Sequence, residues 1–208
     1  MAKNLKGRLI TFEGAEGSGK STQAKLVVNY IRKRGRKVLH IREPGGVPIS
    51  EAIRKILLSL SSKNMAKECE MLLYMAARAQ LVKEVIRPAL NQGMIVLCDR
   101  FLDSTMAYQG FGYGVDMKMI RTIGRFATFG IQPDLTLLFD MDASQGLQRI
   151  VRKKDRIESR ALAYHRRVRY GYRQIAAKNP RRVKVIRAYG DKAAIQAQVR
   201  FYLDRLLG

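Results

Sequence analysis

Two patterns of apolar and polar positions alternate along the chain. Five short apolar runs predict buried strands, and between them apolar side chains recur every three or four residues, which predicts helices with one buried face. The strands are expected at 8–13, 38–41, 94–98, 135–139 and 183–186. The helices are expected at 20–34, 50–60, 67–90, 103–109, 116–129, 143–152, 159–177 and 192–207. A break or kink is expected near Pro88, because proline has no backbone N–H to donate.

This alternation predicts an α/β fold in which a five-stranded parallel sheet carries helices on both faces. No repeat or linker interrupts it, so we expect a single domain over residues 1–208. Ligands of such sheets bind at the carboxyl ends of the strands. Charged and glycine-rich residues fall at those ends: 13–14, 42–43, 99–100 and 140. The sequence therefore predicts a site along this edge.

The turn after the first strand matches the phosphate-binding pattern G-x-x-x-x-G-K-[ST] completely and lies between a predicted strand and a predicted helix. Glycines let backbone N–H groups turn toward phosphate oxygens, the lysine neutralises the β- and γ-phosphates, and the hydroxyl can ligate Mg²⁺. The expected ATP-binding residues are Gly14, Ala15, Glu16, Gly17, Ser18, Gly19, Lys20, Ser21 and Thr22. The sequence thus predicts nucleoside triphosphate binding.

Two large classes of phosphate-loop protein do not fit. The chain lacks the Asn-Lys-x-Asp element with which a GTPase reads its base, and a motor ATPase shows an apolar run leading into an Asp-Glu pair. Here the third strand leads into Asp99-Arg100. A guanidinium beside the carboxylate suits a second substrate that carries phosphate.

Composition adds one unusual feature. The 208 residues are 47% hydrophobic, which can fill a core, but the formal net charge is +23. The last 60 residues hold 18 basic and four acidic side chains. Such an excess indicates anionic partners, among which nucleotides, nucleic acid and acidic lipid all qualify. Most of the basic residues after 160, among them Arg166, Arg167, Arg169, Arg181 and Arg182, are expected on the surface.

Cys69 and Cys98 lack the spacing of a metal site or a disulfide framework, and no apolar run is long enough for a membrane span or a signal peptide. We expect a cytoplasmic protein with reduced cysteines and no membrane partner.

The chain resembles the thymidylate kinase family, which phosphorylates dTMP with ATP, over nearly its whole length. The resemblance is carried by the phosphate loop, by Arg42-Glu43-Pro44-Gly45-Gly46, by the helix around Tyr74 and Arg78, and by Asp99-Arg100 with Ser104–Gly110. It implies the P-loop nucleoside monophosphate kinase fold with a short lid at about 149–160. It also implies Mg²⁺ as cofactor and a homodimer that pairs near 67–90.

The resemblance also implies roles for individual side chains. The residues expected to bind dTMP are Glu13, Arg42, Pro44, Tyr74, Arg78, Arg100, Thr105 and Tyr108. Glu13 would accept from the sugar 3′-hydroxyl, Tyr74 and Arg78 would contact thymine, and Arg42 and Arg100 would hold the 5′-phosphate. Ser21 and Asp99 would hold Mg²⁺. Simple helix packing or surface ion pairs remain the alternative for these residues.

Phosphoryl transfer also needs positive charge around the moving group. The interior of the phosphate loop has no basic residue, whereas 149–156 is rich in arginine, as in bacterial-type members with lid arginines. The expected catalytic residues are Lys20, Asp99, Arg149, Arg152 and Arg156, with Arg160 as a further candidate. A solvated basic helix is the competing interpretation.

Two other functions stay open at this point. One is a kinase for a different nucleoside monophosphate. The other is a nucleic-acid-binding P-loop protein, suggested by the net charge of +23. Because no basic and aromatic stacking platform is evident, we expect no specific nucleic acid partner and only non-specific binding of polyanions.

Overall fold

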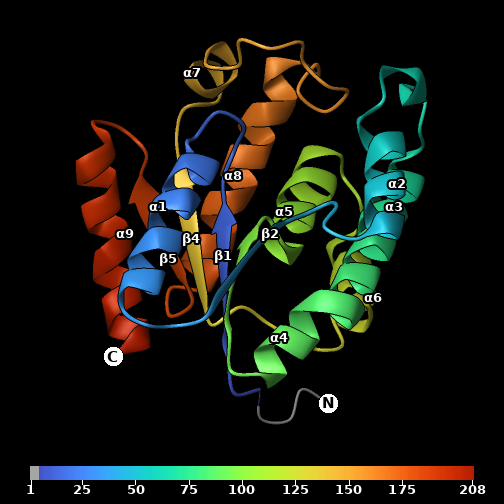
Figure 1. The fold of residues 1–208 in the computed structure, drawn as a ribbon. Helices are drawn as coiled ribbons and strands as arrows, with labels where there is room; N and C mark the ends of the chain where they lie inside the picture. The colour runs from blue at the N-terminus through green and yellow to red at the C-terminus, as the bar shows by residue number, and fades with distance from the viewer. Residues whose placement is uncertain (1–4) are drawn as a thin grey trace.

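The computed structural model describes residues 5–208 and is built on one five-stranded sheet (Figure 1). Its strands are β1 (Arg8–Glu13), β2 (Val38–Arg42), β3 (Ile95–Asp99), β4 (Leu135–Asp140) and β5 (Val183–Arg187). They run parallel in the order β2-β3-β1-β4-β5. The predicted fold class is confirmed, and each strand lies within a residue or two of its expected position.

The helices cover both faces of this sheet. They are α1 (Lys20–Lys33), α2 (Pro48–Leu58), α3 (Lys67–Leu81), α4 (Arg87–Asn91), α5 (Leu102–Thr105), α6 (Met117–Ala127), α7 (Ala143–Gln148), α8 (Leu162–Lys178) and α9 (Lys192–Leu207). A short 3₁₀ turn (Leu60–Ser62) follows α2. One π-helical segment (Val82–Ile86) joins α3 to α4, and another (Met106–Gly112) continues α5. Within residues 5–208 no helix is long and apolar enough to span a membrane.

Two apolar layers hold the helices on the sheet. Successive strand residues point to opposite faces, so Ile10 and Phe12 pack with α1 and α9, whereas Leu9 packs with α3 and α4. A third group, around Tyr108, Leu138 and Tyr172, joins the α5 segment (residues 102–112, α5 with the π-helical turn that continues it) to α8 on the second face. The sheet is thus covered on both sides, and its free ligand-binding edge is the row of carboxyl ends at the top of Figure 1.

Several helix ends differ from the prediction, and three places have a clear physical cause. The predicted helix over 67–90 stays helical to 91, but it changes to a π-helical turn (Val82–Ile86) directly before Pro88, where a break or kink is expected. The π-helical turn ends just before α4, so Pro88 falls in the first turn of a new helical register, where its missing N–H leaves no hydrogen bond unmade.

The other two differences concern the segment after β4. Helix α7 ends at Gln148 instead of 152, and α8 begins at Leu162 instead of 159. Between them Asp155 accepts hydrogen bonds from the N–H groups of Ile157 and Glu158, 2.9 Å each. This local turn competes with helix, which is how aspartate commonly acts.

Candidate active site

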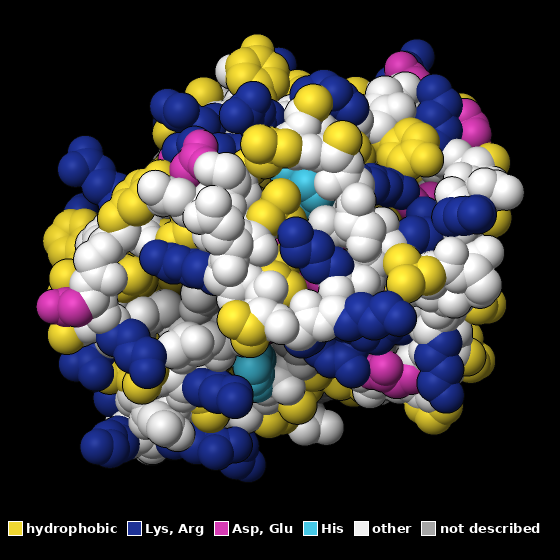
Figure 2. Space-filling model, turned by 90° about the horizontal axis from the view of Figure 1, so that it is seen from above, with side chains coloured by type: hydrophobic (Ala, Val, Ile, Leu, Met, Phe, Trp, Pro, Cys, Tyr) yellow, Lys and Arg dark blue, Asp and Glu magenta, His cyan; other side chains and the backbone are white. Residues whose placement is uncertain are grey.

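The phosphate loop connects β1 to α1 at the carboxyl edge of the sheet. Lys20 is buried there, and its Nζ donates to the carbonyl oxygens of Gly14 (3.0 Å) and Ala15 (2.8 Å). Burial and the Arg100 guanidinium lower the pKa of Lys20 to about 8, against partial compensation by Glu16. The loop lines a cavity of about 340 Å³. Seen from this edge, the molecule shows many Lys and Arg side chains and few acidic ones (Figure 2).

Close backbone packing brings α7 to this loop. Gly17 has φ 69°, and a Cβ there would lie 2.0 Å from the carbonyl oxygen of Gly146 in α7. A Cβ on Gly146 would in turn lie 2.2 Å from Glu16 O. Only glycine permits this approach at both positions. As a result Arg149, one residue beyond α7, lines the same cavity as the phosphate loop.

The two residues predicted to hold Mg²⁺ contact each other. Ser21 Oγ donates to Asp99 Oδ2 at 3.0 Å, and both residues line the phosphate-loop cavity. Asp99 Oδ1 is buried with no hydrogen-bond partner among residues 5–208. A hydroxyl beside an incompletely satisfied carboxylate fits Mg²⁺, which keeps several waters and takes few protein ligands beside substrate phosphates.

A second cavity of about 110 Å³ adjoins the first. Tyr74, Arg78, Thr105 and Tyr108 all line it, so the structure brings together the predicted contacts to the base and sugar. Pro44, which follows a cis peptide bond, lies on its wall. The volume is below the roughly 300 Å³ of small ligand pockets.

Arg78 is the best-fixed side chain of this cavity, at 2% exposure. Its Nε donates to Glu43 Oε2 at 2.7 Å, Nη1 to Thr105 Oγ1 at 3.0 Å, and Nη2 to the carbonyl oxygen of Phe101 at 3.0 Å. Burial raises the pKa of Glu43, against the attraction of the Arg78 guanidinium. The pair locks α3 to the loop after β2 and to α5.

Arg100 and Glu16 form an ion pair of 2.7 Å where the two cavities meet. Arg100 has φ 69°, an uncommon conformation for a residue with a side chain, and its Nη1 donates to Gly14 O (3.2 Å). Burial alone would raise the pKa of Glu16, but Arg100 and Lys20 outweigh it and lower that pKa to about 2. Tyr108 also donates to Glu16, at 3.0 Å. The carboxylate is therefore charged at neutral pH.

Glu13 lies elsewhere than the resemblance implies. It is fully buried and lines neither cavity. Its Oε1 accepts from the Phe101 N–H at 2.7 Å, and its Oε2 accepts from Ser104 (2.5 Å) and Tyr172 (2.9 Å). Burial and the Asp103 carboxylate raise the pKa of Glu13 to about 7. Three protein donors thus already bind this buried carboxylate, which faces neither cavity.

Arg42 is placed with the phosphate loop and not in the second cavity. Its guanidinium pairs with Glu51 at 2.9 Å and donates to Pro44 O, while half of the side chain is exposed. Glu51 in turn accepts from the Gly46 N–H, which lowers its pKa. Arg42 thus lines the phosphate-loop cavity while it is paired with Glu51.

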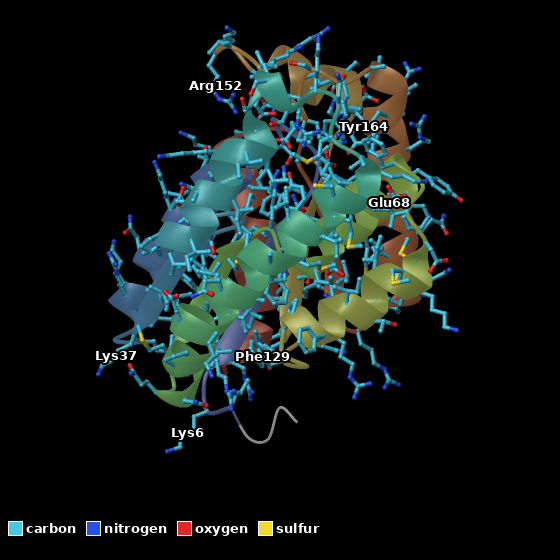
Figure 3. The ribbon with its side chains drawn as sticks, turned by 90° about the vertical axis from the view of Figure 1, so that its right-hand side faces the viewer. Lys6, Lys37, Glu68, Phe129, Arg152 and Tyr164 are labelled. Carbon is cyan, nitrogen blue, oxygen red and sulfur yellow. The ribbon has the colours of Figure 1, made fainter. Side chains whose placement is uncertain are left out.

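The three predicted catalytic arginines of residues 149–160 lie in different surroundings. Arg149 faces the phosphate loop, as described above. Arg152 lines the second cavity, its side chain 63% exposed, and forms a two-point ion pair with Glu158 (2.6 and 2.9 Å) (Figure 3). Arg156 is buried, pairs with Glu70 at 2.7 Å and donates to Leu57 O at 2.8 Å.

Arg160 shares Glu70 with Arg156, at 2.5 Å. The carboxylate of Glu70 is fully buried in α3, and Gln109 donates to it as well, at 2.9 Å. Two guanidinium groups on one buried carboxylate anchor the 149–160 segment to α3. The charge run thus divides into anchoring arginines and arginines that face the cavities.

The expectation that most of the later arginines lie on the surface is confirmed: Arg166, Arg167 and Arg181 are exposed, whereas Arg169 and Arg182 are partly buried. Arg169 pairs with Asp140 at 2.7 Å, and Arg182 pairs with Asp103 at 2.6 Å, each with about a quarter or less of its side chain exposed. Arg167 donates twice to Gly112 O. These arginines tie α8 and its following loop to β4 and to the α5 segment.

Sequence reasoning missed several residues of the site. Glu16 is predicted only as a phosphate-loop residue, yet it lines both cavities, as do Glu43, Arg54 and Arg100. Glu158 and Ser104 line the second cavity. The sequence does contain an indication for Glu16: a carboxylate inside a phosphate-binding loop repels phosphate, so it is expected to bind some other group. Arg54 gives no such signal, because it lies on the amphipathic helix α2.

Comparisons with known proteins show which family the chain is similar to. Residues 12–199 match the family model described as thymidylate kinase. A thymidylate kinase of a Roseiflexus species is 47% identical over 204 residues, covering 91% of this chain and 90% of the relative. One from Exiguobacterium is 44% identical and covers 97% of both chains. The crystal structure of thymidylate kinase from Ehrlichia chaffeensis superposes with a TM-score of 0.79 at 32% identity, covering 95% of this chain and 98% of that one.

Proposed function

The chain belongs to the thymidylate kinase family, and from this premise we propose that it transfers the γ-phosphoryl group of ATP to dTMP with Mg²⁺. An oxygen of the dTMP 5′-phosphate attacks the γ-phosphorus, the bond to the β,γ-bridging oxygen breaks, and ADP and dTDP leave. One observation carries the proposal: two cavities meet at Glu16, Glu43, Arg54 and Arg100, which line both. A donor on the phosphate loop and an acceptor in the second cavity would meet there.

In this arrangement Arg100 holds the acceptor phosphate. It stands where the cavities meet and carries a fork of donors that suits a phosphate dianion. Its partner Glu16, and not Glu13, faces the sugar, because only Glu16 lies on the cavity wall with an oxygen near Tyr108. This replaces the role given to Glu13 by the family resemblance.

Base recognition falls to α3 and α5. The Tyr74 ring offers a face for a pyrimidine, and the Arg78 guanidinium, held by Glu43 and Thr105, offers fixed donors. Since these contacts exist before substrate enters, the base site is preorganised and little ordering entropy is lost on binding.

The γ-phosphoryl group would lie between Lys20 and Arg149. Both line the cavity of the phosphate loop, and positive charge there stabilises the oxygens of the group in transit. Bound through Ser21 and Asp99, Mg²⁺ would neutralise charge on the ATP phosphates. The acceptor is already a phosphate oxygen, so no strong general base is needed.

The 149–160 segment would act as a lid. Arg152, Asp155 and Glu158 narrow the second cavity to less than a nucleotide requires. The C-terminal end of the 149–160 segment is anchored to Glu70 through Arg156 and Arg160. Opening therefore concerns the exposed stretch around Val151, which is 99% exposed.

The direct test is turnover of nucleoside monophosphates by the purified chain with ATP and Mg²⁺. We expect ADP release that depends on dTMP, with dUMP a poorer substrate and other monophosphates inactive. ADP release with another monophosphate alone would keep the kinase chemistry but overturn the assigned acceptor. Absence of turnover with every monophosphate would overturn the proposal itself.

The pH dependence of ATP binding should follow Lys20. Its pKa of about 8 in the free protein means that ATP meets a charged lysine below pH 8 and must draw in a proton above it. We expect ATP affinity to be level from pH 6.5 to 7.5 and to fall toward about tenfold per pH unit above pH 8. Isothermal titration measures this. Lys20→Arg, which stays charged, should flatten the profile, and an unchanged profile would exclude Lys20 as its source.

Arg149 and Arg156 should fail in different ways. Removing Arg149 takes positive charge from the γ-phosphoryl position, so Arg149→Ala should lower kcat about 100-fold with little change in Tm. Removing Arg156 leaves Glu70 short of a partner in a buried position, so Arg156→Ala should lower Tm by several degrees. Steady-state kinetics and thermal melts separate the two. A stable Arg149→Ala variant with normal kcat would shift the lid role to Arg152.

A homodimer is part of the proposal. It is supported by exposed apolar side chains on helices that lie toward the viewer in Figure 3. They lie on α2 (Ile49 and Ile56), α3 (Leu72) and α6 (Met119 and Phe126). Exposed apolar groups gathered on one side commonly mark an interface. Light scattering should give twice the chain mass of 23.6 kDa, and monomer mass would exclude a stable dimer.

We place the reaction in the cytoplasm, in keeping with the free thiols of Cys69 and Cys98.

A further inference from the structure

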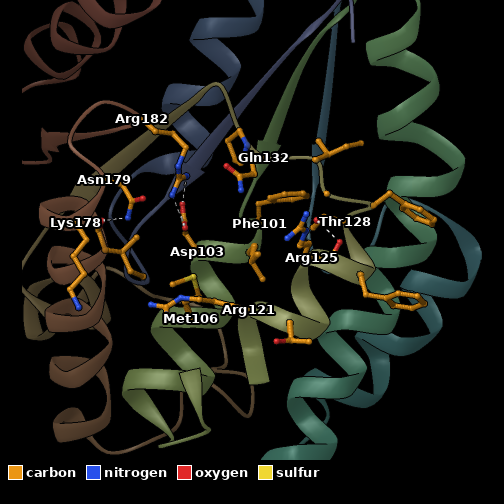
Figure 4. A pocket seen from close by; sticks show the side chains of 18 of the residues that line it. Phe101, Asp103, Met106, Arg121, Arg125, Thr128, Gln132, Lys178, Asn179 and Arg182 are labelled. Carbon is orange, nitrogen blue, oxygen red and sulfur yellow. Dashed lines mark hydrogen bonds and ion pairs between the residues drawn. The ribbon is translucent and has the colours of Figure 1, made fainter. Parts of the chain in front are cut away.

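A cavity of about 1190 Å³, larger than either cavity of the candidate active site, lies apart from them. It opens between α4, α6 and the end of α8, beside the loop that leads into β4 (Figure 4). None of the residues of the phosphate loop lines it. Its size exceeds what a small-molecule pocket needs, so it could hold a ligand as large as a nucleotide.

Cations surround this cavity, and most of them have no carboxylate partner. Arg87, Arg121, Arg125 and Lys178 line it and form no ion pair within residues 5–208. The lone carboxylate on its wall, Asp103, is already neutralised by Arg182 at 2.6 and 3.1 Å. Four uncompensated positive charges around one hollow attract a multiply charged anion.

The floor of the cavity is apolar. Leu102 and Met106 of the α5 segment are partly exposed there, beside the buried Phe101 and Ile175. Amide side chains stand around this floor, among them Gln132 and Asn179 (Figure 4). Amides paired with an apolar surface are the combination that recognises a nucleobase, through its edge and its face.

A single helical segment separates this cavity from the active site. Arg100, Ser104, Thr105 and Tyr108 line the second cavity, whereas Leu102, Asp103 and Met106, on the same segment, line the large one. Any ligand in the large cavity would therefore contact the element that positions the acceptor.

We propose that the cavity between α4, α6 and α8 is a second, non-catalytic binding site for a nucleoside polyphosphate. Its phosphates would lie against Arg121, Arg125 and Lys178, and its base would lie on the floor formed by the α5 segment. Charge complementarity selects this occupant over an apolar segment, because four unpaired cations would be costly to bury against apolar side chains. The inference rests on the proposed function only in calling the other site catalytic.

The test fills the active site first and then measures binding at the large cavity. The full-length chain is saturated with a bisubstrate ligand, in which adenosine and thymidine are joined through a polyphosphate chain. ATP and dTTP are then titrated calorimetrically. We expect one further saturable site per chain, with a Kd below about 1 mM.

Matched charge reversals locate that site. Arg121→Glu with Lys178→Glu should weaken the second binding event at least about tenfold, since two charge-assisted contacts become repulsive. Lys118→Glu with Arg173→Glu is the control. It makes the same changes at exposed positions of the same two helices but outside the cavity, and it should leave affinity within about twofold. All four side chains are exposed, so the variants should fold.

Other outcomes identify other occupants and overturn the proposal. No further binding at low ionic strength, or equal binding by both double variants, would exclude a site here. Tripolyphosphate binding as tightly as ATP would show an anion site that does not read a base. Binding of a thymidine oligonucleotide that ATP fails to displace would indicate single-stranded nucleic acid. Loss of the dimer in the Arg121 and Lys178 variant alone would make the cavity an interface between copies. Failure of dTMP turnover would count against the proposed function and would leave this binding result intact.

Discussion

Arg100→Ala should lower kcat/KM for dTMP by about a thousandfold while the chain stays folded. The substitution removes the fork of donors where the two cavities meet, and it leaves Glu16 with its negative charge beside the incoming phosphate. Loss of one preorganised donor commonly costs 10²–10³ in rate, and the uncovered carboxylate adds repulsion. Steady-state kinetics with varied dTMP, and with ATP saturating, measure the effect.

Two variants control this prediction. Arg100→Lys keeps the charge but not the fork, so its activity should fall between those of wild type and Arg100→Ala. Arg8→Ala removes an exposed arginine that pairs with Asp134 at the opposite edge of the sheet and should leave kcat/KM unchanged. Near-normal turnover by Arg100→Ala would remove Arg100 from the phosphate site.

Arg78→Ala should destabilise the chain by about 3–5 kcal/mol, the usual cost of leaving one member of a buried ion pair alone. Arg78 and Glu43 are 1% and 3% exposed at their side chains, and Thr105 and the carbonyl of Phe101 lose a donor at the same time. For a chain of this length the expected fall in Tm is about 10 °C. Urea titration at pH 7 measures the free energy of unfolding.

A double variant distinguishes the uncompensated charge from the loss of packing. Glu43→Gln combined with Arg78→Ala should be more stable than Arg78→Ala alone, because no charge is then buried without a partner. The single variant should also gain stability as the pH falls, since burial already raises the pKa of Glu43 and favours its neutral form. Equal stability of the single and double variants at pH 7 would contradict the charge explanation.

The same pair shows what an i, i+4 spacing can and cannot convey. Tyr74 and Arg78 are predicted to share a helix face, and both do line the second cavity. Nothing in the local pattern indicates that Arg78 is buried against a glutamate 35 residues away, because that contact depends on how α3 packs against the loop after β2.

Residues 149–156 illustrate the opposite limit. Their composition predicts a cationic segment near phosphate, and Arg149 lines the phosphate-loop cavity. Composition gives no information on which arginine is anchored. Arg156 and Arg160 are drawn to a carboxylate of α3, about 90 residues away in sequence. The charge of +23 divides in the same way, since Arg169 and Arg182 serve as ties between elements.

By itself the sequence determined the parallel sheet, the phosphate loop and the edge on which the site lies. These follow from short-range patterns: apolar periodicity, glycines at a strand-to-helix turn, and charged residues at strand ends. Only the tertiary structure decided which carboxylate faces the second cavity. Glu13 and Glu16 are three residues apart. Glu13 is buried and accepts hydrogen bonds from Phe101, Ser104 and Tyr172, whereas Glu16 lies on the cavity wall and pairs with Arg100. Their partners come from the turn after β3, from α5 and from α8, so their hydrogen bonds are decided by packing across the chain and not by the motif in which both stand.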